Sequence, residues 1–584
     1  MTDTVTWIRA ANRGDLADGE ALSVPTPDGR TIALFFTNGE YYATDNQCPH
    51  MGFPLVRGLV RNGVVTCDWH GRSFDLAGGG CFHSQCDDVR VFQTEVREDS
   101  VWVRFEAEPE NRREAWLRLL WEGLLDDDRW TMSKAIAQLL HAGVPEDDIV
   151  ELIMRHVGRH VASSHDLDAG DDVSRLINGL KVGQRYEGED RLIALTIAAR
   201  SAAGPAADRN ENVLMPPPYD WERTASWVRN FSRDRMGNRI ERCLYTAREN
   251  GDGDRILPLL LECAVEPHFL DFGDSLVSLA YLAELQELFG WERSGELIFN
   301  LGAKLIGQPR QEPERFRRDA VTRMRELQPR LDKVQRIDDE REFDEDVLTK
   351  AVTSVDILRS FDAVANALEN VPIDRLITSF VLLAADRMAR TPVAVDAGWQ
   401  NLTRELNLAS SLRAIKRRGG LTVAAKGLFH VAWHFFADRW INIDYRSIAE
   451  ALDAPSTNIS DEDSASNAVL DAIKNLDVDI VGNHVMAYLK SGYSGDRLLH
   501  DMGREILRDD TGQEILPTLR TVFEEWEILT GTDGKLGAGH PATAQLLVGL
   551  ARYATDIRSN SDSRSAAVTA MHFAEGKTTV EMFE

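Results

Sequence analysis

The sequence predicts a small all-β domain followed by a large all-α domain, and three observations support this division. Short β-rich runs and turn residues are concentrated in about the first 105 residues. From about residue 112 onward, apolar residues recur at helical spacing. At 584 residues the chain exceeds the length of about 250–300 residues at which a single hydrophobic core usually stops growing. We therefore expect domains at residues 1–108 and 112–584, with an internal boundary near the charged stretch 332–346.

The β elements are predicted from runs of β-branched and aromatic residues that alternate with turn signals. An Asn-Gly pair, which favours a hairpin turn, separates the first two clear runs, TIALFFT at 31–37 and EYYATD at 40–45. Further strands are expected at VVTC (64–67), VRVFQTEV (89–96) and VWVRF (101–105). Glycines at 78–80 interrupt the pattern and predict a loop.

The helical elements follow from apolar residues three and four positions apart. Helix punctuation agrees with this spacing, because Gly143 and Pro145 end one pattern and the acids at 146–148 favour the first turn of the next helix. The clearest segments are EAWLRLLWEGLL, SKAIAQLLHAG, DDIVELIMRHV, DSLVSLAYLAELQELFG, DILRSFDAVANAL, RLITSFVLLAADRMA and ATAQLLVGLARYA.

The charge and composition exclude several classes of protein. With 66 Lys and Arg against 94 Asp and Glu, the net charge is −28, which argues against binding to nucleic acid or anionic lipid. No segment approaches the roughly 18 consecutive apolar residues of a membrane span, and the N-terminus lacks a signal-peptide pattern. Six cysteines are too few for a disulfide scaffold. We expect a soluble cytoplasmic protein.

The strongest motif lies in the β domain, where Cys48 and His50 form one pair and Cys67 and His70 a second. Sixteen residues separate the two pairs. Two interpretations compete, since two thiolates and two imidazoles can hold one tetrahedral zinc ion or the two irons of a [2Fe–2S] cluster. Each pair carries one Cys and one His, whereas zinc fingers usually group like residues. This favours the cluster, with both sulfurs on one iron and both imidazoles on the other.

The motif C-x-H, a gap of sixteen, and C-x-x-H, extended by CDWHGRSFDLAGG, resembles the Rieske family over residues 5–106. The resemblance is closest to the ferredoxin-like Rieske proteins. It implies a [2Fe–2S] cluster, one-electron transfer, and His50 and His70 as solvent-near ligands that face a redox partner. The first ligand loop lacks the cysteine that high-potential members use for a disulfide. The resemblance therefore implies a potential towards the bottom of the range of about −150 to +300 mV.

The remaining cysteines fall into two groups. Cys81 and Cys86, with His83, form a loop beyond the second ligand pair, where they are either two free thiols or a local disulfide that caps the cluster. Cys243 and Cys263 lie in helical patterns and are expected to be small core residues.

Several histidines of the helical part are candidates for a metal or catalytic site. His430, His434 and Asp438 form a stripe along one face of an apolar helix, and His156 and His160 are also four residues apart. His268 begins a further apolar segment. Each of these histidines is alternatively a hydrogen-bonded core residue. The iron motif of Rieske oxygenases is absent, because Val157 stands where the carboxylate before His160 would be.

The helical part resembles, over scattered segments, fusions of a Rieske domain with a helical domain. It is similar in HVAWHFF and HPATAQLL to questin-oxidase-like helical oxygenases. These resemblances imply an oxidoreductase, of an oxygenase type, that acts on a small organic substrate. An external reductase or ferredoxin would supply electrons to the cluster, which would relay them to a second non-haem iron or other cofactor in the helical domain. The alternatives are a non-enzymatic redox-responsive module and an electron-transfer subunit whose helical domain is a docking scaffold.

Overall fold

The protein is described by a computed structural model. It covers residues 6–559, with the exception of residues 28, 84–85, 106–112, 160–168, 201–212, 267–272, 308–316, 339–342, 392–397, 442, 451, 453–460, 509–511 and 537–538.

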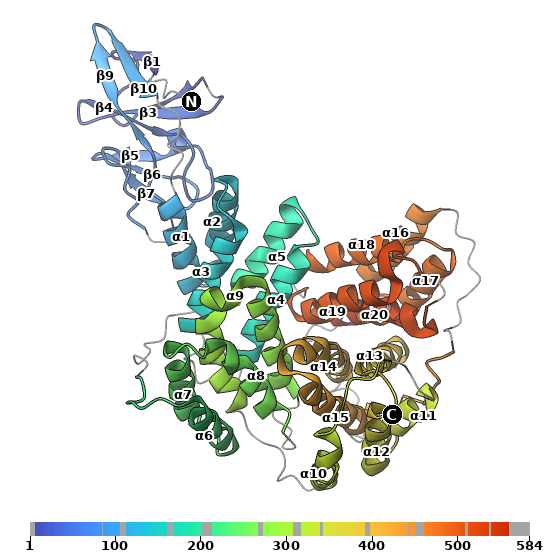
Figure 1. The fold of residues 1–584 in the computed structure, drawn as a ribbon. Coiled ribbons are helices and arrows are strands. Elements are labelled where there is room, and N and C mark those ends of the chain that lie inside the picture. The colour runs from blue at the N-terminus through green and yellow to red at the C-terminus, as the bar shows by residue number, and fades with distance from the viewer. Residues whose placement is uncertain are drawn as a thin grey trace, which may run out of the picture. The chain divides into compact units, whose positions relative to one another are not determined.

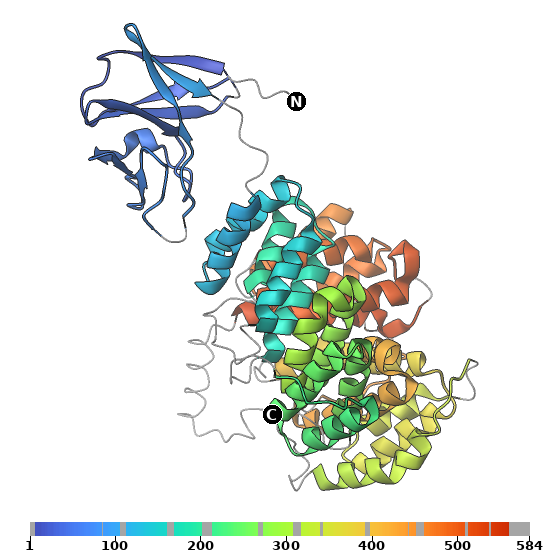
Figure 2. The same ribbon diagram turned by 60° about the vertical axis from the view of Figure 1, so that its left-hand side comes forward.

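The N-terminal part contains three small antiparallel sheets, in the strand orders β1-β10-β9, β2-β3-β4-β8 and β5-β6-β7. Figure 2 places the β5-β6-β7 sheet at one end of this β body. The strands are β1 (Thr6–Asn12), β2 (Ala21–Pro25), β3 (Thr31–Thr37), β4 (Glu40–Asp45), β5 (Leu59–Arg61), β6 (Val64–Thr66), β7 (Ser73–Asp75), β8 (Val91–Phe92), β9 (Thr94–Arg97) and β10 (Ser100–Phe105).

Strand β3 is the centre of this part because both of its faces are buried. Ile32 and Leu34 face a core built with β8 and β10, while Ala33 and Phe35 face a second core that contains Cys48 and Cys67. Successive side chains of a strand point to opposite faces, so one strand serves both cores. The hairpin of β3 and β4 was predicted from the sequence. The single strand expected at 89–96 is instead two strands, β8 and β9, interrupted at Gln93.

From Arg113 onward the described residues form α-helices joined by loops and short 3-10 turns, which confirms the predicted order of an all-β part and an all-α part (Figure 1). The helices are α1 (Arg113–Leu125), α2 (Arg129–His141), α3 (Glu146–Arg159), α4 (Ala169–Gly183), α5 (Gly188–Arg200), α6 (Trp221–Arg233), α7 (Gly237–Glu249), α8 (Gly253–Ala264), α9 (Asp274–Ile306), α10 (Arg318–Leu331), α11 (Glu345–Val352), α12 (Ile357–Leu368), α13 (Ile373–Arg390), α14 (Gly398–Gly419), α15 (Leu421–Ala437), α16 (Glu462–Lys474), α17 (Val478–Lys490), α18 (Gly495–Leu507), α19 (Gly512–Thr530) and α20 (Ala544–Ser559).

Several of these helices begin at an aspartate whose carboxylate accepts a hydrogen bond from a backbone N–H of the first turn. This capping satisfies donors that have no partner inside the helix. It occurs at Asp128, Asp220, Asp344, Asp356 and Asp461.

The contacts of the chain divide it into two compact units, and each is described by itself below. The first covers Met1–Ile149 and so includes α1 and α2 with the β strands, while the second begins at Val150. Within the second unit, α14 is central, because it packs against α8, α9, α13, α15 and α19. Among the described residues, no helix is long and apolar enough to cross a membrane.

Candidate functional site

Two loops with the same backbone turn carry the Cys and His residues of the motif. The Gly52 amide donates to the Cys48 carbonyl at 2.7 Å, and the Gly71 amide donates to the Cys67 carbonyl at 3.0 Å. Both glycines have a positive φ, 77° and 69°, which a residue with a side chain rarely adopts. The spacing from cysteine to glycine is therefore the same in both loops, although the histidine position differs by one residue.

The loops bring the like side chains together. Cys48 and Cys67 are buried in one core, and burial, with the nearby charge and hydrogen bond of Cys67, raises the pKa of the Cys48 thiol to about 11. The rings of His50 and His70 lie 4.9 Å apart at 87°. His50 is half-buried and His70 is exposed, in keeping with the solvent-near position expected for both.

The first imidazole has the properties that a metal ligand requires. Nδ1 of His50 is buried and has no hydrogen-bond partner, so it is available to a metal. Burial and the nearby charge of Arg72 lower the pKa of His50, which favours the neutral imidazole that metals bind.

Aromatic side chains border the second ligand loop. Trp69 stacks on His70 with the ring centroids 4.3 Å apart, and Phe53 lies 5.9 Å from Trp69. Trp69 is 54% exposed and Met51, which follows His50, is 38% exposed. Exposed apolar side chains thus lie beside the two imidazoles, a feature that suits contact with another protein surface.

Within the first unit, helix α2 contacts the backbone of the first ligand loop. The Trp130 indole N–H donates to the His50 carbonyl at 2.9 Å, and the Lys134 ammonium donates to the Pro49 carbonyl. These bonds fix the loop from outside through its main chain and leave the His50 ring nitrogen unused.

The histidine stripe predicted in the helical part lies on α15 and is buried. His430 is 2% exposed and His434 is 4% exposed, and Asp438 follows the helix with 6% exposure. Nε2 of His434 would be 3.0 Å from a Cβ at Gly273, the residue before α9, so a side chain at Gly273 would crowd this imidazole.

The other predicted site residues have different positions. His156 lies on α3 and is fully buried. His160 and His268 lie outside the described residues. Cys243 and Cys263 are buried core residues, as predicted, and burial raises the pKa of the two thiols to about 11 and about 12.

The structure adds two residues to this region that the sequence did not indicate, Glu405 on α14 and Arg387 on α13. Both are buried, and Nε of Arg387 donates to Glu405 at 3.0 Å. A second guanidinium N–H of Arg387 donates to the Asp438 carbonyl at 3.2 Å. Arg387 on α13 therefore connects Glu405 on α14 with the residue that follows α15.

The two carboxyl groups retain oxygen atoms that nothing satisfies. Oε1 of Glu405 and Oδ2 of Asp438 are buried without a hydrogen-bond partner. Burial, with the nearby Asp438 charge, raises the pKa of Glu405 to about 8 against the opposing effect of Arg387. Burial likewise raises the pKa of Asp438 to about 6. Such a pair can hold a proton near neutral pH or accept a cationic ligand.

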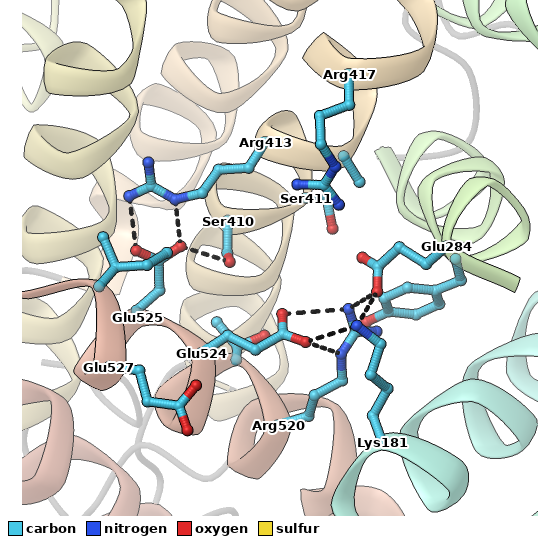
Figure 3. A pocket seen from close by; sticks show the side chains of 14 residues that line it. Lys181, Glu284, Ser410, Ser411, Arg413, Arg417, Arg520, Glu524, Glu525 and Glu527 are labelled. Carbon is cyan, nitrogen blue, oxygen red and sulfur yellow. Dashed lines mark hydrogen bonds and ion pairs between the residues drawn. The ribbon is translucent and has the colours of Figure 1, made fainter. Parts of the chain in front are cut away.

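A second polar region of the helical unit is a cavity of about 370 Å³ between α4, α9, α14 and α19. Figure 3 shows Arg413 directed at Glu525, and Lys181 and Arg520 gathered around Glu524. Arg413 makes two bonds to Glu525, at 2.8 and 2.7 Å. Nε of Arg520 donates to Glu524 at 3.1 Å. The charged groups of this cavity thus satisfy one another.

Comparison with known proteins identifies the first part of the chain. The family model described as the Rieske [2Fe-2S] domain matches residues 6–93, and the rest of the chain has no family assignment. The ferredoxin component of the p-cumate 2,3-dioxygenase system from Pseudomonas putida is 33% identical over 97 residues, which cover 16% of this chain and 82% of the relative.

Apoptosis-inducing factor 3 of Homo sapiens is 35% identical over 91 residues, or 15% of each chain. The chain therefore spans only a small part of that relative. The structure titled "Sphingomonas yanoikuyae B1 ferredoxin" has a TM-score of 0.16 and 26% identity, and the match covers 18% of this chain and all of the ferredoxin. Together with the ligand loops, the sequence match to the dioxygenase ferredoxin components shows that the chain belongs, through its N-terminal domain, to the Rieske [2Fe–2S] family.

Proposed function

We propose that the chain is an iron–sulfur oxidoreductase in which Cys48 and Cys67 bind one iron of a [2Fe–2S] cluster and His50 and His70 bind the other. When bound, the cluster supplies reversible one-electron transfer. The observation that carries this assignment is the pair of matching loops, which place the two buried thiols together and leave the His50 Nδ1 atom without a hydrogen-bond partner.

We further propose that these electrons serve a second site on the helical part, at Glu405, Asp438 and the stripe of His430 and His434. Its support is the pair of buried carboxylate oxygens that have no partner. Leaving a buried acceptor unsatisfied costs about 1–3 kcal/mol, so such atoms suggest a group that is bound in use. The reaction proposed is an oxygenation of a small organic substrate with electrons from an external reductase or ferredoxin.

In this proposal Arg387 orients the Glu405 side chain, and Glu405 transfers a proton to the bound substrate. The hydrogen bond from Arg387 fixes the direction of Glu405, whose pKa of about 8 keeps a proton on it at neutral pH. This carboxyl group can donate the proton to a bound substrate. Asp438, with a pKa of about 6, is ionised at the same pH and can accept a proton or hold a positive charge.

The experiment is a metal and electron count on the purified full chain, combined with EPR of the reduced protein and measurement of oxygen uptake. We expect two cluster irons with a Rieske signal, and a further metal or organic cofactor. The variant Cys48→Ser should lose the EPR signal, whereas Glu405→Gln should keep the signal and lose oxygen uptake. A chain that holds only two irons, binds no other cofactor and consumes no oxygen would exclude the oxygenase proposal.

An electron-transfer subunit is the second candidate, and the comparisons favour it. Several relatives are named as ferredoxin components of dioxygenase systems. This candidate predicts that His434→Ala leaves electron transfer unchanged and that the protein forms a stoichiometric complex with a separate oxygenase. Loss of function in His434→Ala with an intact cluster would argue against it.

A further inference from the structure

A second pair of thiols lies beside the ligand loops and has no part in the proposed cluster. Cys86 is 8% exposed and belongs to the same core as Cys48 and Cys67, and Cys81 is half-buried and packs against that core. Both are free thiols in the structure.

Backbone contacts hold both ends of this segment. Cys81 pairs with Phe74 in an isolated β-bridge, and its amide donates to Asp88 Oδ1 at 2.8 Å. Close to the other end, the Val89 amide donates to the Gly79 carbonyl at 2.8 Å. Residues on either side of the two cysteines, Gly79 and Val89, are thus bonded to each other.

The two thiols also interact directly. The Cys86 thiol, with further help from His83, lowers the pKa of the Cys81 thiol to about 6, and Cys81 together with burial raises the pKa of Cys86. Cys81 is the more accessible sulfur, while Cys86 is the buried sulfur of the pair. An attacking thiolate and an adjacent second thiol are the two parts that disulfide exchange requires.

We propose that Cys81 and Cys86 form a redox-active dithiol that closes to an intramolecular disulfide by exchange with a low-molecular-weight disulfide such as oxidised glutathione. The Cys81 thiolate attacks one sulfur of the small disulfide and releases one thiol. The Cys86 sulfur then attacks the Cys81 sulfur and releases the second thiol. The protein loses two electrons and two protons, and the small disulfide gains them as two thiols.

The test uses the full chain with its cluster, equilibrated without oxygen in buffers of graded reduced and oxidised glutathione. Remaining thiols are alkylated, and the peptides are weighed. In reducing buffer we expect the peptide with Cys81 and Cys86 to carry two alkyl groups. In oxidising buffer we expect it to carry none and to weigh two hydrogen masses less than the unmodified dithiol peptide. Cys243, which is buried in α7, should remain alkylatable after unfolding and serves as the internal control.

Two variants separate the steps. In Cys86→Ser the second attack cannot occur, so we expect a stable glutathione adduct on Cys81. In Cys81→Ser we expect several-fold less adduct on Cys86, because that thiol is buried. Visible absorption of the cluster checks that each variant is folded. Full alkylation of both cysteines in wild type at every glutathione ratio, or a wild-type Cys81 adduct that never closes, would overturn the proposal. Neither outcome depends on the oxygenase proposal.

Discussion

Two polar regions of the helical unit share α14 but differ in how their charges are satisfied. In the cavity of Figure 3, Arg413 and Arg520 are bonded to Glu525 and Glu524, so each buried charge has an opposite charge beside it. At the junction of α13, α14 and α15, by contrast, one arginine faces two carboxyl groups, and one oxygen of each carboxyl has no partner.

The difference separates a structural network from a site that is ready for a ligand. In the closed set of ion pairs, Glu524 and Glu525 are each bonded to an arginine. The Glu405 and Asp438 pair retains bonding capacity for another molecule at a cost in stability. The comparison therefore leads us to assign function to the smaller polar cluster rather than to the larger cavity.

The largest loss of stability should come from removing one cation of the ion-pair network in the cavity of Figure 3. Arg520→Met removes a guanidinium that is 5% exposed and leaves Glu284 and Glu524 with one cation fewer. We expect the free energy of unfolding to fall by about 3–5 kcal/mol, since the buried acids lose a paired charge. Denaturant unfolding followed by circular dichroism measures it.

The matched control for this change is Arg336→Met, which removes an exposed partner of Asp338. Because that arginine is 86% exposed, the loss should be within about 1 kcal/mol. Equal losses in the two variants would show that the network contributes no more than a surface pair.

An intermediate loss of stability should distinguish Glu525, which lies in the cavity of Figure 3, from Glu405, which lies in the cluster at α13, α14 and α15. Glu525→Gln removes the charge that binds Arg413 in two places, and we expect a loss of about 2–4 kcal/mol. Glu405→Gln replaces a carboxyl group whose pKa of about 8 already makes it neutral at pH 7, so its loss should be within about 1 kcal/mol. Denaturant unfolding of both variants at pH 7 measures the difference. A larger loss of unfolding free energy for Glu405→Gln than for Glu525→Gln would contradict the assignment of function to the Glu405 and Asp438 cluster.

The smallest effect is a pH dependence of stability. The pKa of Glu405 is raised from its ordinary 4.5 to about 8, so the folded chain binds a proton that the unfolded chain has released between these values. Stability should therefore fall as pH rises through this window, by up to about 1.4 kcal/mol per pH unit from this residue. Unfolding measured at pH 6 and pH 7 should show a shallower fall for Glu405→Gln than for wild type. Parallel profiles would contradict the raised pKa.

The sequence was sufficient where the structure depends on short-range spacing. The β3–β4 hairpin follows from one Asn-Gly pair, and the ligand loops follow from four residues and their intervals. Strands β1, β2, β5 and β7 were not predicted. Strands β5 and β7 have only three residues each, and β1 and β2 each bury a single residue, Ala11 and Val24. The run at 89–96 was taken as one strand because only pairing with different neighbours, β4 for β8 and β10 for β9, divides it.

The helical site was predicted only in part, for a related reason. His430, His434 and Asp438 stand out because they share one helix face. Glu405 resembles any polar residue of an amphipathic helix in the sequence, where it follows Arg404 in TRELN. Its burial arises from α13 and α15, which pack against α14, and its partner Arg387 lies on another helix. Contacts between helices cannot be predicted from the spacing of residues along one helix.

The shared turn of the two ligand loops has a consequence for the speed of electron transfer. Each loop is closed by its own amide-to-carbonyl bond, at Gly52 and at Gly71, and α2 holds the first loop through its main chain. Atoms held in this way move little when the charge of a bound centre changes by one electron. A small structural rearrangement means a small reorganisation energy, so the frame that positions the ligands also favours rapid exchange of electrons in both directions.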